Sequence, residues 1–163
     1  MKRLLVLSLA ATGCGLSPNV VDGSVAGEAM SEIQTVLWGG RYIVLIDEAV
    51  DCIDLAWVNH TYSEGADLGD RDFSALQFTF SRGVEVLEGT FSVQGAAEVN
   101  AKFLDYRDGI FDAADEYRAR DGFLTVDSVT DKDRASGTFD LDFGDGQALT
   151  GEFEAQWCVN LPD

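Results

Sequence analysis

The stretch from Ala135 to Cys158 constrains the fold more than any other part of the chain. Apolar side chains fall on every second residue along its first half, from Phe139 to Phe143, and again along its second half, from Leu149 to Trp157. This period of two is typical of strands that bury one face. The glycine-rich segment 144–146 separates the two halves. We therefore predict an antiparallel β-hairpin.

The register of this hairpin can be predicted from the alternation, because opposed residues must lie on the same face of a sheet. A two-residue loop would place Asp142 opposite Leu149 and break the pattern, whereas a three-residue loop at 144–146, a type I turn with a bulge, restores it. Phenylalanine rings then cover glycines on the partner strand, a known stabilising device. The predicted pairs are Leu141 with Leu149, Phe139 with Gly151, and Phe153 with Gly137.

Short apolar segments at close spacing fill the rest of the chain. The run Tyr42 to Ile46 lacks alternation, which is typical of a central strand buried on both faces. Residues 97–106 alternate as a strand does, although their composition also suits a helix, and residues 110–120 suit a helical turn or a long loop. Strands are expected at 32–38, 42–46, 55–58, 76–80, 85–93, 97–106 and 123–129 besides the hairpin.

These segments predict the fold class. We expect one all-β domain over residues 32–163, an antiparallel β-sandwich or flattened barrel of about seven to nine strands. The length of 163 residues allows a single domain with a sizeable core.

The amino terminus is a different kind of sequence. Two basic residues precede an apolar run from Leu4 to Ala11 and small residues before Cys14, which is typical of an export signal. The segment Ala11 to Cys14 resembles the lipobox of bacterial lipoproteins. This resemblance implies a signal peptide at 1–13 and a diacylglycerol thioether on Cys14, and Gly15 after it favours the outer membrane. Residues 14–31 are expected to form a tether with room for an edge strand.

The net charge narrows the range of partners. The chain carries 11 basic and 29 acidic residues, a formal charge of −18. Removal of the signal would also remove Lys2 and Arg3, which leaves about −20. So acidic a domain repels nucleic acid and anionic membrane surfaces. We therefore expect no nucleic acid partner, contact with the membrane through the lipid alone, and room for a protein partner in the envelope.

The number of cysteines is consistent with export of the protein. Once Cys14 is assigned to lipid, Cys52 and Cys158 remain as a pair, and such a pair is expected to form a disulfide in an oxidising compartment. Two alternatives stay open at this point. One is a metal site shared with His60, and the other is a cysteine nucleophile.

No catalytic constellation stands out, and no cofactor is expected. The loop residues Asp67, Asp70 and Asp72 form a weak candidate Ca²⁺ site. We expect a structural or protein-interaction role first. The alternatives are a binder of a small apolar or carbohydrate ligand, in the barrel interior or at an aromatic rim, and a hydrolase that uses two converging carboxyl groups. The tryptophans, Trp38, Trp57 and Trp157, are expected to lie in the core or on the rim.

Three short motifs follow one another along the chain and end at Cys158. They are Glu88 to Phe91, Ser136 to Asp140, and Leu149 to Phe153. Together they resemble a group of small cell-envelope lipoproteins that are abundant in myxobacteria and have no established biochemical function. The resemblance covers about residues 41–158. It implies an envelope location and an intramolecular disulfide, and it transfers no catalytic residue.

Overall fold

The computed structural model describes residues 19–30, 32–52, 72–81, 85–93, 98–106, 116–159 and 161. These residues form ten strands, and the predicted all-β fold is confirmed. The strands are β1 (Val20–Ser24), β2 (Thr35–Gly39), β3 (Tyr42–Ile46), β4 (Phe73–Phe80), β5 (Gly89–Ser92), β6 (Val99–Tyr106), β7 (Glu116–Arg118), β8 (Asp121–Val129), β9 (Arg134–Gly144) and β10 (Gln147–Trp157). Within this part of the chain, no helix is long and apolar enough to cross a membrane.

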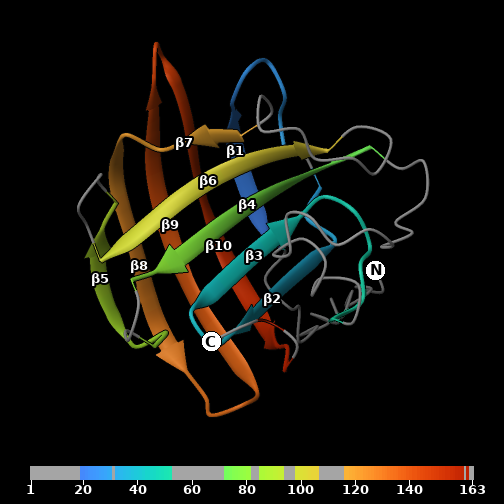
Figure 1. The fold of residues 1–163 in the computed structure, drawn as a ribbon, viewed down its shortest axis with the longest axis vertical. Coiled ribbons are helices and arrows are strands. Elements are labelled where there is room, and N and C mark those ends of the chain that lie inside the picture. Colours follow the sequence, from blue (N-terminus) through green and yellow to red (C-terminus); the bar gives the residue numbers. More distant parts are fainter. Residues whose placement is uncertain are drawn as a thin grey trace, which may run out of the picture.

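The strands belong to one continuous sheet with the order β5-β8-β9-β10-β2-β3-β4-β6-β7, and β1 adds to β10. The sheet curls on itself, so that β3, β4 and β6 cross in front of β8, β9 and β10 (Figure 1). The pairs are antiparallel except for β10 and β2, which run parallel at Gln156 and Trp157. The predicted flattened barrel is thus one curled sheet whose two halves face each other.

The closing hairpin has the predicted register. Leu141 lies opposite Leu149, and each of Phe139 and Phe153 lies opposite a glycine. The turn is different from the expected one. Asp145 and Gly146 both have positive φ, at 57° and 78°, as a two-residue type I′ turn requires. The extra residue that parity demands is accommodated by a bulge in the strand pair beside the turn, where the register shifts between Gln147 and Ala148.

The main core lies between the two halves of the sheet. The rings of Phe78 on β4 and Phe139 on β9 approach to 5.5 Å between centroids, and those of Phe80 and Phe91 approach to 5.1 Å. The largest fully buried side chains include Phe78, Phe80, Phe103, Met30, Ile43, Leu45, Leu76, Leu124, Leu141 and Leu149. These side chains therefore occupy the space between the two halves of the sheet.

A second apolar cluster lies on the outer face of β2, β3, β4 and β6, and it contains Val44, Ile46 and Cys158. The predicted burial of β3 on both faces is therefore confirmed, and β4 is covered in the same way. The expected disulfide joins Cys52 and Cys158 with 5.4 Å between Cα atoms. Because both sulfurs are engaged, the alternatives of a Cys-His metal site and a cysteine nucleophile at these residues are wrong.

The remaining predicted segments agree with the observed strands only in part. Strand β6 settles the choice at 97–106 in favour of a strand, and β7 appears within 110–120, where a helical turn or loop was expected. Strand β5 is shorter than the predicted 85–93. Strand β1 lies inside the segment 14–31 and pairs with β10 from Val20 to Ser24. The signal segment and the strand at 55–58 lie outside the described residues.

Candidate functional site

An open cleft of about 1030 Å³ is lined by residues at the end of β10, away from the β9-β10 turn. It is formed by the β2-β3 turn, the segment before β5, the β8-β9 turn and the last residue of β10. This volume is in the range of small-molecule sites. The described lining residues are Trp38, Gly40, Arg41, Glu85, Val86, Leu87, Glu88, Val129, Asp131, Lys132 and Trp157.

Two tryptophans pack together in the wall of the cleft. The parallel pairing of β10 with β2 places Trp157 beside Trp38, and their rings meet edge to face with 4.7 Å between centroids. Trp38 is only 5% exposed, and its buried indole Nε1 has no hydrogen-bond partner among the described residues. A buried donor without an acceptor costs free energy, so such a group calls for an explanation.

Arg41 contributes a second donor of the same kind. It follows Gly40, whose positive φ of 50° shapes the tight β2-β3 turn. The guanidinium carbon stands 5.4 Å from the ring centre of Tyr42, and Nη2 donates to the Tyr42 hydroxyl at 3.4 Å. The Arg41 Nε is buried, and no described residue accepts from it. Trp38 and Arg41 thus both line the cleft, but these two donor atoms are buried behind its surface.

The rim of the cleft carries opposite charges and an apolar side chain. Glu85, Glu88 and Asp131 are exposed carboxylates, and Lys132 is an exposed cation. Glu88 also accepts a hydrogen bond from the backbone amide of Val129 at 3.2 Å, which joins the segment before β5 to the end of β8. Leu87 between them is 56% exposed. The described lining holds no histidine, cysteine or hydroxyl nucleophile.

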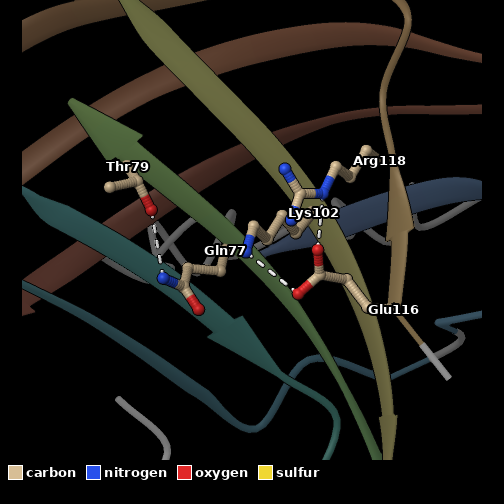
Figure 2. Close-up of polar contacts among 5 residues, drawn as sticks. All are labelled: Gln77, Thr79, Lys102, Glu116 and Arg118. Carbon is tan, nitrogen blue, oxygen red and sulfur yellow. Dashed lines mark hydrogen bonds and ion pairs between the residues drawn. The ribbon is translucent and has the colours of Figure 1, made fainter. Parts of the chain in front are cut away.

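A separate polar cluster lies on the outer face of β4, β6 and β7 (Figure 2). Lys102 Nζ and Arg118 Nε donate to the two carboxylate oxygens of Glu116, at 2.9 and 2.6 Å, and Gln77 donates to Thr79 at 3.0 Å. Burial opposes ionisation of Glu116, but the hydrogen bonds from Lys102 and Arg118 outweigh it and lower the pKa of this carboxyl. The donors and acceptors satisfy one another, so this cluster holds β7 in place.

Carboxyl groups were also expected as possible catalytic groups of a hydrolase. Burial raises the pKa of Asp47, and the charges of Glu48 and Asp105 add to the shift. However, Asp47 Oδ1 accepts the backbone amide of Ser74 at 2.7 Å, and its own amide donates to the Ser74 carbonyl. Asp47 therefore ties the end of β3 to the start of β4, and it does not line the cleft.

Most of the other residues that the sequence singled out as candidate site residues lie outside the described part of the chain. They are Cys14, Trp57, His60, Asp67 and Asp70. Asp72 is described and lies exposed just before β4. Across the described ranges, no group of three or more His, Cys, Asp or Glu residues could hold a metal ion.

Sequence reasoning placed Trp38 and Trp157 in the core or on the rim but missed Arg41 and the acidic rim. The one available signal was the Gly39-Gly40 pair, which marks a turn next to an arginine. The partnership of Trp38 with Trp157 depends on the parallel β10-β2 pair, whose register leaves no local mark in the sequence.

Comparisons with protein-family models, with curated proteins and with solved structures found no match. The resemblance to small myxobacterial lipoproteins therefore stays a prediction, and function has to be inferred from the geometry of the cleft.

Proposed function

We propose that the protein is a lipid-anchored β-domain of the bacterial cell envelope that acts by binding a small ligand, without catalysis. The observation that carries this proposal is the open cleft of about 1030 Å³ beside Trp38 and Trp157, with Arg41 and Lys132 in its lining. The filled interior favours this rim over a site inside the barrel. The lipobox-like segment supports an anchor on Cys14.

The anchor is tested by the Cys14→Ala variant expressed in a bacterial host. It should lose membrane association and labelling with a radioactive fatty acid, because the acceptor thiol is gone. The matched control is the Cys52→Ser/Cys158→Ser double variant, which removes two other cysteines and should remain in the membrane fraction. Unchanged partitioning of Cys14→Ala would contradict the anchor.

Binding is tested with the mature domain and fractionated envelope extracts, one rich in glycans, one in lipids and one in peptides. A ligand at about one hundred times its Kd stabilises the folded state by about 2.7 kcal/mol, which raises the Tm of a domain of this size by roughly 5 to 10 °C. At least one fraction should produce this shift, and it should vanish in Trp157→Ala, with each protein compared with its own ligand-free Tm.

If no fraction shifts the Tm of the wild-type domain, ligand binding in the cleft is refuted. The structural or protein-interaction role expected from the sequence would then take its place.

A further inference from the structure

We infer that the end of the sheet that carries the cleft is a membrane-facing surface, which rests on a neutral, zwitterionic bilayer. This inference builds on the lipid anchor of the proposed function. The surface, which we call the cleft end, comprises the β2-β3 turn, residues 85–88, the β8-β9 turn and the last residue of β10. The β8-β9 turn and the β9-β10 turn lie at opposite ends of the molecule (Figure 1).

Asn19 marks the place where the tether joins the sheet. Its Oδ1 accepts the backbone amide of Glu154 on β10 at 2.7 Å, and β1 then pairs with β10 from Val20 to Ser24. Asn19 is the fifth residue after Cys14, and five residues span at most about 18 Å when fully extended. A lipid on Cys14 would therefore hold Asn19 close to the bilayer.

The junction at Asn19 lies nearer to the cleft end than to the β9-β10 turn. Because each strand residue advances about 3.4 Å, Glu154 is about 10 Å from Trp157 at the end of β10 and about 30 Å from Asp145 in the turn. Strand β1 is antiparallel to β10, so it runs from the junction toward the β9-β10 turn. The anchor therefore keeps the cleft end at the membrane and the β9-β10 turn away from it.

Exposed apolar side chains at the cleft end suit contact with lipid. Leu87 on the cleft rim is 56% exposed. Val159 is 74% exposed, and it follows Cys158, whose backbone amide donates to the carbonyl of Trp38. Aliphatic side chains gain free energy when they leave water for the boundary of the acyl chains. The β9-β10 turn at the other end exposes the charged Asp145 instead.

The charge of the cleft end favours a neutral bilayer over an anionic one. Three exposed carboxylates, from Glu85, Glu88 and Asp131, stand there against Arg41 and Lys132, and the chain as a whole carries −18. An anionic surface would repel this end. A zwitterionic headgroup such as phosphoethanolamine ends in an ammonium group, which attracts exposed carboxylates. The cleft then lies beside the headgroup layer, so that a ligand reaches it from the membrane surface.

The orientation is tested with single fluorescent labels on the lipidated protein, purified from a bacterial host and placed in vesicles of phosphatidylcholine and phosphatidylethanolamine. One added cysteine is labelled selectively, because Cys14 carries the lipid and Cys52 is bonded to Cys158. The label is attached at Asp131→Cys or at Asp145→Cys, which are both exposed turn positions and lose the same charge. A lipid with a spin-labelled headgroup should quench the first label at least about five times more than the second, because the length of β9 separates them by more than about 30 Å.

Two apolar residues of equal exposure test the contact with lipid. Leu87→Gln should lower the quenching of the Asp131→Cys label about twofold, because the cleft end then gains less by leaving water. The matched control is Phe123→Gln. Phe123 is also 56% exposed, but it lies on β8 opposite Asp140, toward the β9-β10 turn, and its loss should leave the quenching unchanged.

The lipid composition tests the chemistry of the surface. Replacement of phosphatidylethanolamine by phosphatidylglycerol should weaken the quenching of the Asp131→Cys label at about 20 mM salt, because the carboxylates of the cleft end are then repelled. The loss should be much smaller at about 500 mM salt, which screens this repulsion.

The inference is overturned if the two labels are quenched equally, if Leu87→Gln and Phe123→Gln behave alike, or if anionic vesicles quench the Asp131→Cys label more than neutral ones at low salt. In each case, flotation of the protein with the vesicles and a Tm shift with an envelope fraction would keep the proposed function and reject only the membrane-facing surface. If Cys14→Ala stays in the membrane fraction as the wild type does, the anchor and the orientation fail together.

Discussion

At the scale of single residues, two phenylalanine-glycine pairs hold the closing hairpin against the core. A Cβ added at Gly137 would collide with the carbonyl oxygen of Thr125 on β8 and would come within 2.9 Å of the Phe153 ring. Gly151 is equally enclosed, by the Val20 carbonyl oxygen and the Phe139 ring. Neither glycine has a positive φ, so these positions require glycine because of space and not because of backbone conformation.

The Gly137→Ala variant should therefore lower the free energy of unfolding by about 3 kcal/mol, because the backbone of β8 cannot move away without disturbing the sheet. The matched control is Gly146→Ala in the turn. There a Cβ meets no atom within 4 Å, and only the positive φ is penalised, by about 1 kcal/mol. Urea denaturation of the two variants measures the difference. Equal losses would contradict the steric account.

At the scale of elements, local patterns predicted the strands better than their connections. Alternation of apolar and polar residues predicted the β9-β10 register correctly. It also indicated that β6 is a strand, where packing of Phe103 in the core outweighs the helix propensity of its neighbours. Strand β7 was missed because three residues are too few to show a period. The prediction placed the extra residue in a three-residue loop, whereas the structure places it in a bulge beside a two-residue turn. The alternation of side chains is the same in both cases, so it could not distinguish them.

The short strand β7 depends on the ion cluster around Glu116, whose side chain is only 18% exposed. Because the pKa of Glu116 is held below its ordinary value of 4.5, the cluster stabilises the fold above about pH 4.5. This contribution disappears as the pH falls through the lowered pKa. Glu116→Gln should thus cost about 1 kcal/mol at pH 7 and less at pH 3.

The measurement is chemical denaturation of the wild type and Glu116→Gln at both pH values. Glu152→Gln, an exposed strand position on β10, serves as the control and should show no comparable dependence on pH. A Glu116→Gln deficit that is as large at pH 3 as at pH 7 would show that the side chain acts by packing alone.

At the scale of the whole molecule, the disulfide connects the region just after β3 with the end of β10. It closes a loop over a sequence separation of 106 residues, and Cys158 packs in the outer apolar cluster. The backbone amide of Cys158 also donates to the Trp38 carbonyl at 2.7 Å. The same closure therefore holds the strand end that brings Trp157 to the cleft.

Loss of the disulfide should destabilise the domain by about 3 to 5 kcal/mol in the chain-entropy model, which corresponds to a Tm lower by roughly 10 °C. The Cys52→Ser/Cys158→Ser variant should show this loss in calorimetry. Reductant should lower the Tm of the wild type towards that of the variant and leave the variant unchanged. Equal stability of wild type and variant under oxidising conditions would argue that the disulfide contributes nothing.

The central claim is that the domain binds its ligand at the cleft beside Trp38 and Trp157. The most direct test follows the indole N–H signals of the tryptophans in ¹H–¹⁵N NMR spectra during titration with the envelope fraction that raises the Tm, with Trp57→Phe and Trp157→Phe used for assignment. Our account predicts that the Trp157 signal moves most, because its half-buried ring lies in the wall of the cleft, together with backbone amides at Arg41 and Val129. Saturable shifts confined to another face, or none at all, would contradict it.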